Sequence, residues 1–211
     1  AGSLSGWLRY QLGTFTLSAP GWGLPDSAQT TSEPGTLKYL AQVGATDVSR
    51  EWRAVEHPDL PGQRVEVGGF DPLVGLVPPR SSVDSLAMKT GNFARSVLGW
   101  MPRLEIARAE TRTLGDGLYR VTVEIVNTGW LPTALEVGVT TRKARPVRAE
   151  IVGQDGVTVV GGPPVKLIPT ISGSGGRERI EWIVEARSGA KIVVRAATPR
   201  AGESRREVTL R

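Results

Sequence analysis

The sequence contains no cysteine, and this absence removes several kinds of chemistry at once. A chain without thiols forms no disulfides, holds no metal through thiolates and has no cysteine nucleophile. Long apolar runs are also missing, and none approaches the roughly 20 residues that span a bilayer, so we expect no membrane span. The first residues lack the basic and apolar regions of a signal peptide, which we interpret as a mature or truncated start that is compatible with secretion.

Aromatic residues are few, at 6% of the chain, and the positive charge is uneven. Residues 1–102 contain 8 basic and 9 acidic side chains, whereas residues 103–211 contain 18 and 12, a net charge of +6. A basic half can indicate nucleic-acid binding. Here acidic residues alternate with basic ones, as in Arg177-Glu178-Arg179, and we therefore predict a solvated surface and no nucleic-acid partner.

Glycine and proline are plentiful, with 26 and 15 residues, and indicate many turns. The hydrophobic pattern changes at Leu104 from a mixed spacing to a period of two. Before that point the sequence predicts a helix or loop running into a strand over 7–18, a loop over 19–35, helical spacing over 36–56, a strand over 64–70 and a helix over 81–100 that Pro102 ends. After it we predict strands at 104–112, 117–127, 133–140, 147–152, 156–160, 178–186, 190–197 and 205–210. The prediction is an α+β chain in which residues 103–211 form an immunoglobulin-like antiparallel β-sandwich.

Three stretches resemble the zinc carboxypeptidases of the carboxypeptidase A-like family. The first is Gly2-Ser-Leu-Ser-Gly-Trp-Leu-Arg-Tyr-Gln with the expected strand Thr14–Leu17, and the second is His57-Pro-Asp-Leu-Pro-Gly-Gln-Arg-Val-Glu-Val-Gly-Gly-Phe. The third, Val121-Thr-Val-Glu-Ile-Val-Asn-Thr-Gly-Trp-Leu-Pro-Thr, is similar to the sandwich that follows the catalytic domain in bacterial members. The resemblance implies that residues 1–102 are the C-terminal portion of a carboxypeptidase-like catalytic α/β domain and 103–211 the sandwich domain.

By the same resemblance Glu66 is the catalytic glutamate. In the family a carboxylate at the end of a central strand takes a proton from zinc-bound water and delivers it to the leaving amine. Gly68 and Gly69, which follow it, let backbone and substrate approach closely. Alternation alone predicts equally well that Glu66 is a solvent-facing residue between two valines.

The family's metal ligands are missing from this sequence. They are a His-x-x-Glu pair and a later histidine, but the chain has one histidine, His57, and a site with two histidine ligands cannot be built from it. We interpret His57 as structural. Tyr10 lies on the wrong side of the Gly-Ser turn to be the family's substrate-capping tyrosine, and the substrate-binding residues stay unknown. We therefore expect Zn²⁺ in the parent enzyme and none bound to this chain alone.

Two hypotheses follow for the function. In the first, the chain is a fragment of a secreted or cell-envelope zinc metallocarboxypeptidase that hydrolyses C-terminal peptide bonds. It would be inactive alone, and its partners would be a peptide substrate and the missing N-terminal catalytic half or another chain. In the second, it is a non-catalytic binding or scaffold module of the cell envelope or extracellular space.

Overall fold

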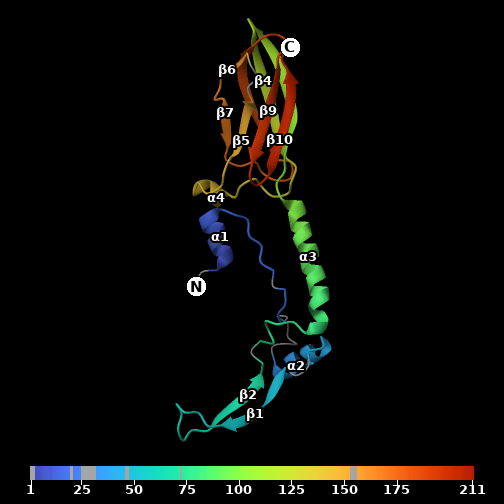
Figure 1. Cartoon of the computed structure of the whole chain (residues 1–211), viewed down its shortest axis with the longest axis vertical. Coiled ribbons are helices and arrows are strands. Elements are labelled where there is room, and N and C mark those ends of the chain that lie inside the picture. The colour runs from blue at the N-terminus through green and yellow to red at the C-terminus, as the bar shows by residue number, and fades with distance from the viewer. Residues whose placement is uncertain (1–2, 20, 25–31, 46–47, 72, 153–155) are drawn as a thin grey trace. The chain divides into compact units, whose positions relative to one another are not determined.

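The computed structural model describes residues 3–19, 21–24, 32–45, 48–71, 73–152 and 156–211. The chain forms two compact units, one made of residues 1–18 with 96–211 and the other of residues 19–95 (Figure 1). The first unit contains a β-sandwich and the second is a small α+β unit, so the predicted mixed, strand-rich fold with antiparallel sheets is confirmed. The predicted domain boundary between residues 102 and 103 stays a prediction.

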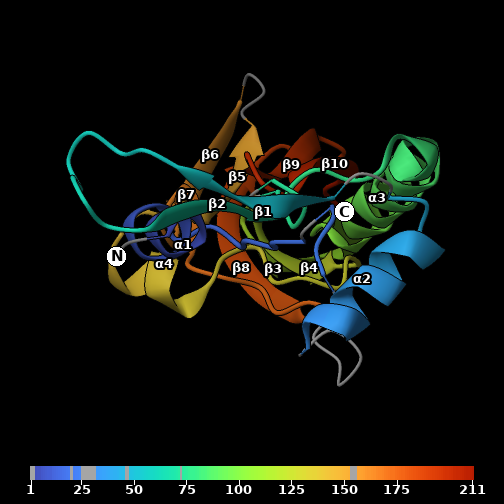
Figure 2. The same cartoon turned by 90° about the horizontal axis from the view of Figure 1, so that it is seen from below.

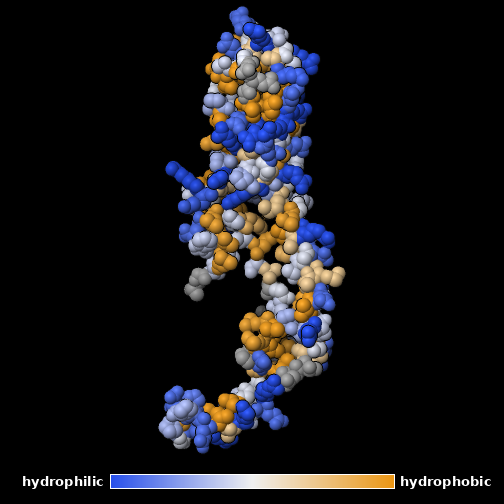
Figure 3. All heavy atoms as spheres, viewed as in Figure 1, coloured by the Kyte–Doolittle hydropathy of each residue, from blue (hydrophilic) through white to orange (hydrophobic). Residues whose placement is uncertain are grey.

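The sandwich is made of two four-stranded antiparallel sheets. One sheet has the order β10 (Gly202–Thr209), β9 (Lys191–Thr198), β5 (Val147–Val152), β7 (Val165–Ile168). The other has the order β3 (Leu104–Gly115), β4 (Leu118–Asn127), β8 (Arg177–Ala186), β6 (Val157–Gly161). In Figure 3 hydrophilic side chains, in blue, cover much of the sandwich in view, with hydrophobic side chains, in orange, between them.

The apolar alternate residues of both sheets meet between them and form the core. They include Val121, Val123, Ile125, Trp182, Val184, Ile192 and Val194. Trp182 is only 1% exposed, and its indole N–H donates to the Pro163 carbonyl at 2.9 Å. The large ring is thus buried, and its one polar atom keeps a hydrogen-bond partner.

Side-chain hydrogen bonds connect the two sheets where β10 lies beside β3. The register of β3 shifts between Ile106 and Arg108, which leaves backbone groups for other partners. The Ser204 hydroxyl accepts the Ile106 N–H, and the Arg206 guanidinium donates to the carbonyls of Ile106 and Ala107 at 3.0 and 2.8 Å. One side of the sandwich is therefore closed by side chains.

A buried asparagine, Asn127, organises the end of the sandwich where β4 finishes. Its side-chain oxygen accepts the N–H groups of Arg103 and Gly129 at 3.0 and 3.1 Å. Its side-chain N–H₂ donates to three carbonyls, those of Leu131 at 2.8 Å, Ile171 at 3.3 Å and Ser172 at 3.2 Å. The chain approaches closely here, because a Cβ on Gly129 would lie 2.1 Å from the Met101 carbonyl oxygen.

The predicted strand over 133–140 is wrong. Thr133 and Ala134 exchange hydrogen bonds with Thr170 and Ile171, and the chain then forms the short helix α4 (Glu136–Thr140). The reason is tertiary: the backbone of Gly138 packs directly on Gly13, an approach that the alternating pattern does not record. Strand β7 was not predicted, since its four residues follow Pro163 and Pro164 without a clear period.

Helix α1 (Leu4–Leu12) lies in the same unit as the sandwich. The Ser3 hydroxyl caps its start, and Gly13 ends it in the left-handed conformation. Arg200 donates to the carbonyls of Leu12 and Gly13, a favourable partner for a helix C-terminus. The expected strand over 14–17 is wrong, because these residues join no sheet.

The second unit contains α2 (Glu33–Gln42) and a hairpin of β1 (Ser49–Val55) and β2 (Val65–Phe70), seen from another side in Figure 2. Helical spacing over 36–56 is therefore right only in its first part, because residues 49–55 pair with β2, a partner that the spacing of apolar residues does not reveal. The predicted strand at 64–70 and helix at 81–100 are confirmed by β2, by the 3-10 turn η1 (Arg80–Ser82) and by α3 (Val83–Trp100). Most of the predicted loop over 19–35 lies outside the described residues.

Replacing Asn127 by alanine should destabilise the sandwich by roughly 3 kcal/mol or more. The change removes the acceptor of two N–H groups and the donor to three carbonyls, of which that of Ile171 still accepts the Thr133 N–H. Each buried group left unsatisfied costs about 1–3 kcal/mol. Urea unfolding followed by circular dichroism measures the loss. Thr128→Ala is the local control, because its exposed hydroxyl makes one long contact of 3.4 Å. Equal losses in the two variants would contradict the role given to Asn127.

An ion-pair network on the outer face of the β10-β9-β5-β7 sheet should make stability depend on pH. Glu150, whose side chain is 15% exposed, accepts from Arg148 at 2.7 Å and Arg195 at 2.8 Å. The hydrogen bond from Arg148 is the main cause that lowers the pKa of Glu150, partial burial opposes it, and Arg195 adds to the lowering.

Because the pKa of Glu150 is lowered in the folded state, its stabilisation is complete above the unfolded value of about 4.3 and is lost as pH falls through the folded value. Glu150→Gln should cost about 1 kcal/mol at pH 7 and flatten the loss of stability between pH 6 and 3. Urea midpoints across this range are the measurement. Glu207→Gln, which removes an exposed pair with Lys191, should leave the urea midpoint nearly unchanged across this range.

Candidate functional site

Glu66 is the second residue of β2 and lies close to the loop that joins the two strands of the hairpin. It is opposite Ala54 of β1, and its neighbours Val65 and Val67 point to the other face. Its carboxylate accepts from Arg64 at 3.2 Å from Nε and 2.5 Å from Nη2. The Glu66 side chain is 38% exposed and that of Arg64 83%, so the ion pair is at the surface and contributes little to stability.

The backbone around Glu66 is closely packed against the neighbouring strand. A Cβ on Gly68 would lie 2.6 Å from the Trp52 Cα, so only glycine fits there. A hollow of about 580 Å³ lies beside this part of the hairpin and is lined by Arg50, Glu51, Arg53 and residues 67–71. Glu66 does not line it.

The other predicted or considered site residues are not brought together with Glu66. His57 lies in the loop between β1 and β2, where its Nδ1 accepts the N–H of Asp59 at 3.2 Å. Tyr10 belongs to the other compact unit, with the Arg9 guanidinium 6.0 Å from its ring centre. The interpretation of His57 as a structural residue agrees with this turn-forming hydrogen bond.

The residues present do not fit a zinc ion. Within the described part of the chain, no three histidine or carboxylate side chains are grouped so that they could share a metal. The only histidine of the sequence already uses Nδ1 in a backbone hydrogen bond. Zinc in proteins takes three or four protein ligands, and this arrangement offers one at most.

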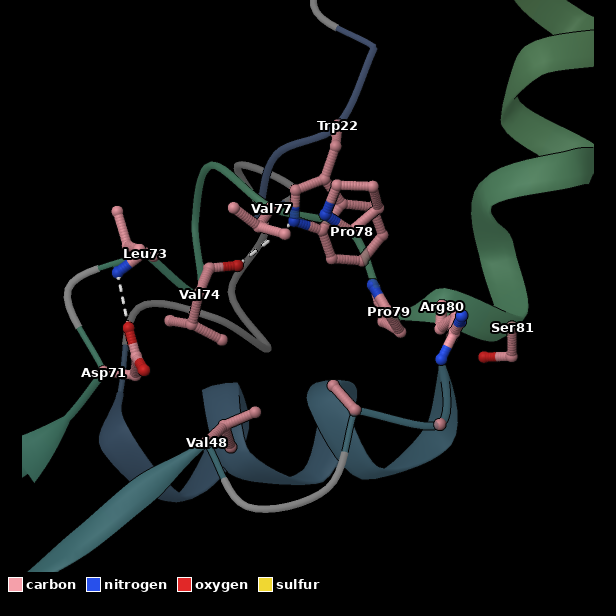
Figure 4. Close-up of a pocket in the computed structure, with 12 residues that line it drawn as sticks. Trp22, Val48, Asp71, Leu73, Val74, Val77, Pro78, Pro79, Arg80 and Ser81 are labelled. Carbon is pink, nitrogen blue, oxygen red and sulfur yellow. Dashed lines mark hydrogen bonds between the residues drawn. The ribbon is translucent and has the colours of Figure 1, made fainter.

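Sequence reasoning missed a pocket of about 480 Å³ in the second unit (Figure 4). Trp22, Val74 and Val77 form its apolar part, and the indole N–H of Trp22 donates to the Val74 carbonyl at 3.1 Å. Asp71 and Arg80 lie at opposite ends of it in Figure 4, where Asp71 accepts the N–H of Leu73. The described residues that line the pocket combine apolar walls with one charge of each sign, and they include no histidine and no paired carboxylates for catalysis. Its lining comes from Trp22, from residues 44, 45 and 48, and from residues between 71 and 81, and no local pattern relates these three segments.

One protein family matches the part of the chain that forms the sandwich. Residues 103–209 match the model of a family described as a domain of unknown function, DUF8731, and the chain belongs to this family. None of the curated proteins compared with the chain matches it. None of the helices in the described ranges is both long and apolar enough to cross a bilayer.

Proposed function

We propose that the chain is part of a zinc metallocarboxypeptidase that hydrolyses C-terminal peptide bonds, with Glu66 as the general acid/base. The observation that carries the proposal is the Val65–Phe70 strand, in which a partly exposed carboxylate is followed by two glycines that pack tightly against Trp52. The ion-pair partner of this carboxylate, Arg64, is 83% exposed, and the Glu66 side chain is itself partly open to solvent and so within reach of a substrate. The carboxypeptidase-like origin of residues 1–102 and the immunoglobulin-like character of the sandwich are parts of the same proposal.

Glu66 would act by proton transfer. A carboxylate fixed on a strand can take a proton from attacking water and return it to the leaving amine, provided that both lie within hydrogen-bond reach. Among the described residues, β1 and β2 pair with no further strand, and the apolar side chains of Trp52 and Val67 are exposed. A hairpin with unpaired edges and exposed apolar side chains is able to pair with further strands of a larger sheet. The metal ligands would come from polypeptide outside these 211 residues, in a secreted or cell-envelope protein.

A second candidate function is a non-catalytic binding or scaffold module. It is favoured because no three side chains among the described residues lie close enough together to bind one metal ion. In that case Glu66 is a surface residue of the hairpin, and the sandwich is the functional part.

The purified 211-residue chain should bind no stoichiometric zinc and show no carboxypeptidase activity, because it supplies one histidine. Metal analysis after dialysis against zinc-containing buffer tests this expectation. One tightly held zinc ion per chain would overturn it and require carboxylate ligands near His57.

In a polypeptide that also contains the His-x-x-Glu pair and the later histidine, Glu66→Gln should lower kcat by about 100- to 10,000-fold. The amide keeps the shape of the side chain but cannot accept the proton, so zinc content and KM should change little. Peptide hydrolysis kinetics and metal analysis give both readouts. Glu56→Gln, in the loop before His57, is the matched control and should be silent. A normal kcat in Glu66→Gln would contradict the catalytic role of Glu66 and favour the non-catalytic module.

A further inference from the structure

The outer face of the β3-β4-β8-β6 sheet carries charged side chains in ordered rows. The strands are labelled in Figure 2. Antiparallel register sets Arg108 beside Glu124 and Glu124 beside Arg179, and in the next row Glu110 beside Thr122 and Thr122 beside Glu181. One row further on, Arg112 of β3 lies directly opposite Arg120 of β4. Two arginines therefore face solvent side by side.

The carboxylates near these two arginines already have partners. Glu110 pairs with Arg108 at 2.5 Å, and Glu181 pairs with Arg179 at 3.2 Å and also accepts from the Thr122 hydroxyl at 3.2 Å. Glu124 pairs with Arg177 at 2.9 Å. Within the described ranges, Arg112 and Arg120 make no side-chain hydrogen bond or ion pair. The two guanidinium groups keep their full donor capacity.

Like charges directly opposite each other on neighbouring strands destabilise a sheet. The arrangement is relieved when an anion lies between them, and the planar fork of arginine suits the oxygens of phosphate or sulfate. The surface is hollowed at this point, with a volume of about 510 Å³ lined by both arginines, Thr111, Thr122, Arg179 and the two paired carboxylates Glu110 and Glu181.

We propose that Arg112 and Arg120 form a binding site for a single phosphate or sulfate group. Glu110 and Glu181 border the site on one side and repel further negative charge, so a compact oxyanion fits and an extended polyanion does not. The group can be a free ion or an ester on a larger molecule. The site lies in the sandwich unit and does not depend on Glu66 or on any metal.

Calorimetric titration of the full 211-residue chain tests the proposal. The probes are inorganic sulfate for a free ion and methyl phosphate for an ester, with chloride at equal ionic strength as the blank. Saturable binding at one site per chain is expected for at least one probe, and the stronger probe identifies the source. Arg112→Gln/Arg120→Gln should weaken binding at least tenfold. Arg142→Gln/Arg187→Gln removes the same charge from two turns of the same unit and should change affinity less than twofold.

Thermal unfolding gives an independent readout. In low-salt buffer without oxyanions, the Arg112→Gln/Arg120→Gln variant should melt no lower than the wild type, because the repulsion is gone, and sulfate should raise its Tm less. If the double variant does not fold, each single replacement should weaken binding by itself. The proposal is overturned if neither probe binds saturably to the wild type, or if the Arg112/Arg120 and Arg142/Arg187 variants lose affinity equally.

Discussion

The hydrogen bonds of the buried Asn127 amide hold together the chain segments that enter and leave the sandwich at one of its ends. One side chain holds the chain where it enters β3, the turn after β4 and the segment that precedes β8. An apolar side chain of similar volume could fill the space, but it would leave backbone donors and acceptors in a dry environment without partners. The loops at this end are therefore fixed by one polar group, while the apolar residues between the sheets supply the general driving force for folding.

The sequence predicts an element of this fold correctly when residues close together in the chain determine its conformation. Strand β5 was predicted over its whole length, 147–152, because Val147, Ala149 and Ile151 alternate with polar residues between turn signals. Residues 133–140 have a similar alternation but form a helix, since the contact of Gly138 with Gly13 involves residues far apart in the sequence. Local periodicity cannot distinguish these two cases.

The candidate site shows the same limit. The strand bearing Glu66 and its exposed position follow from alternation, and so does the neighbour Arg64, two residues away on the same face. The pocket of Trp22, Asp71 and Arg80 does not, because no local pattern relates residues so far apart. The pair of Arg112 and Arg120 requires the register of β3 and β4, including the shifts on either side of the paired stretch. A one-residue difference in register would separate the two guanidinium groups.

The closure of the sandwich has a consequence for self-association. On one side Arg206 occupies the carbonyls of Ile106 and Ala107, and on the other Pro163 and Pro164 connect β6 to β7 without N–H groups to offer. The carbonyls of Ile106 and Ala107 are thus closed to a strand from a second molecule, whereas on the other side the prolines remove donors only from the loop between the edge strands β6 and β7. The β1–β2 hairpin has no comparable protection in the part of the chain that the structure describes. Each strand of this hairpin has one unpaired edge, so residues 49–70 are a place where a strand from another molecule could add.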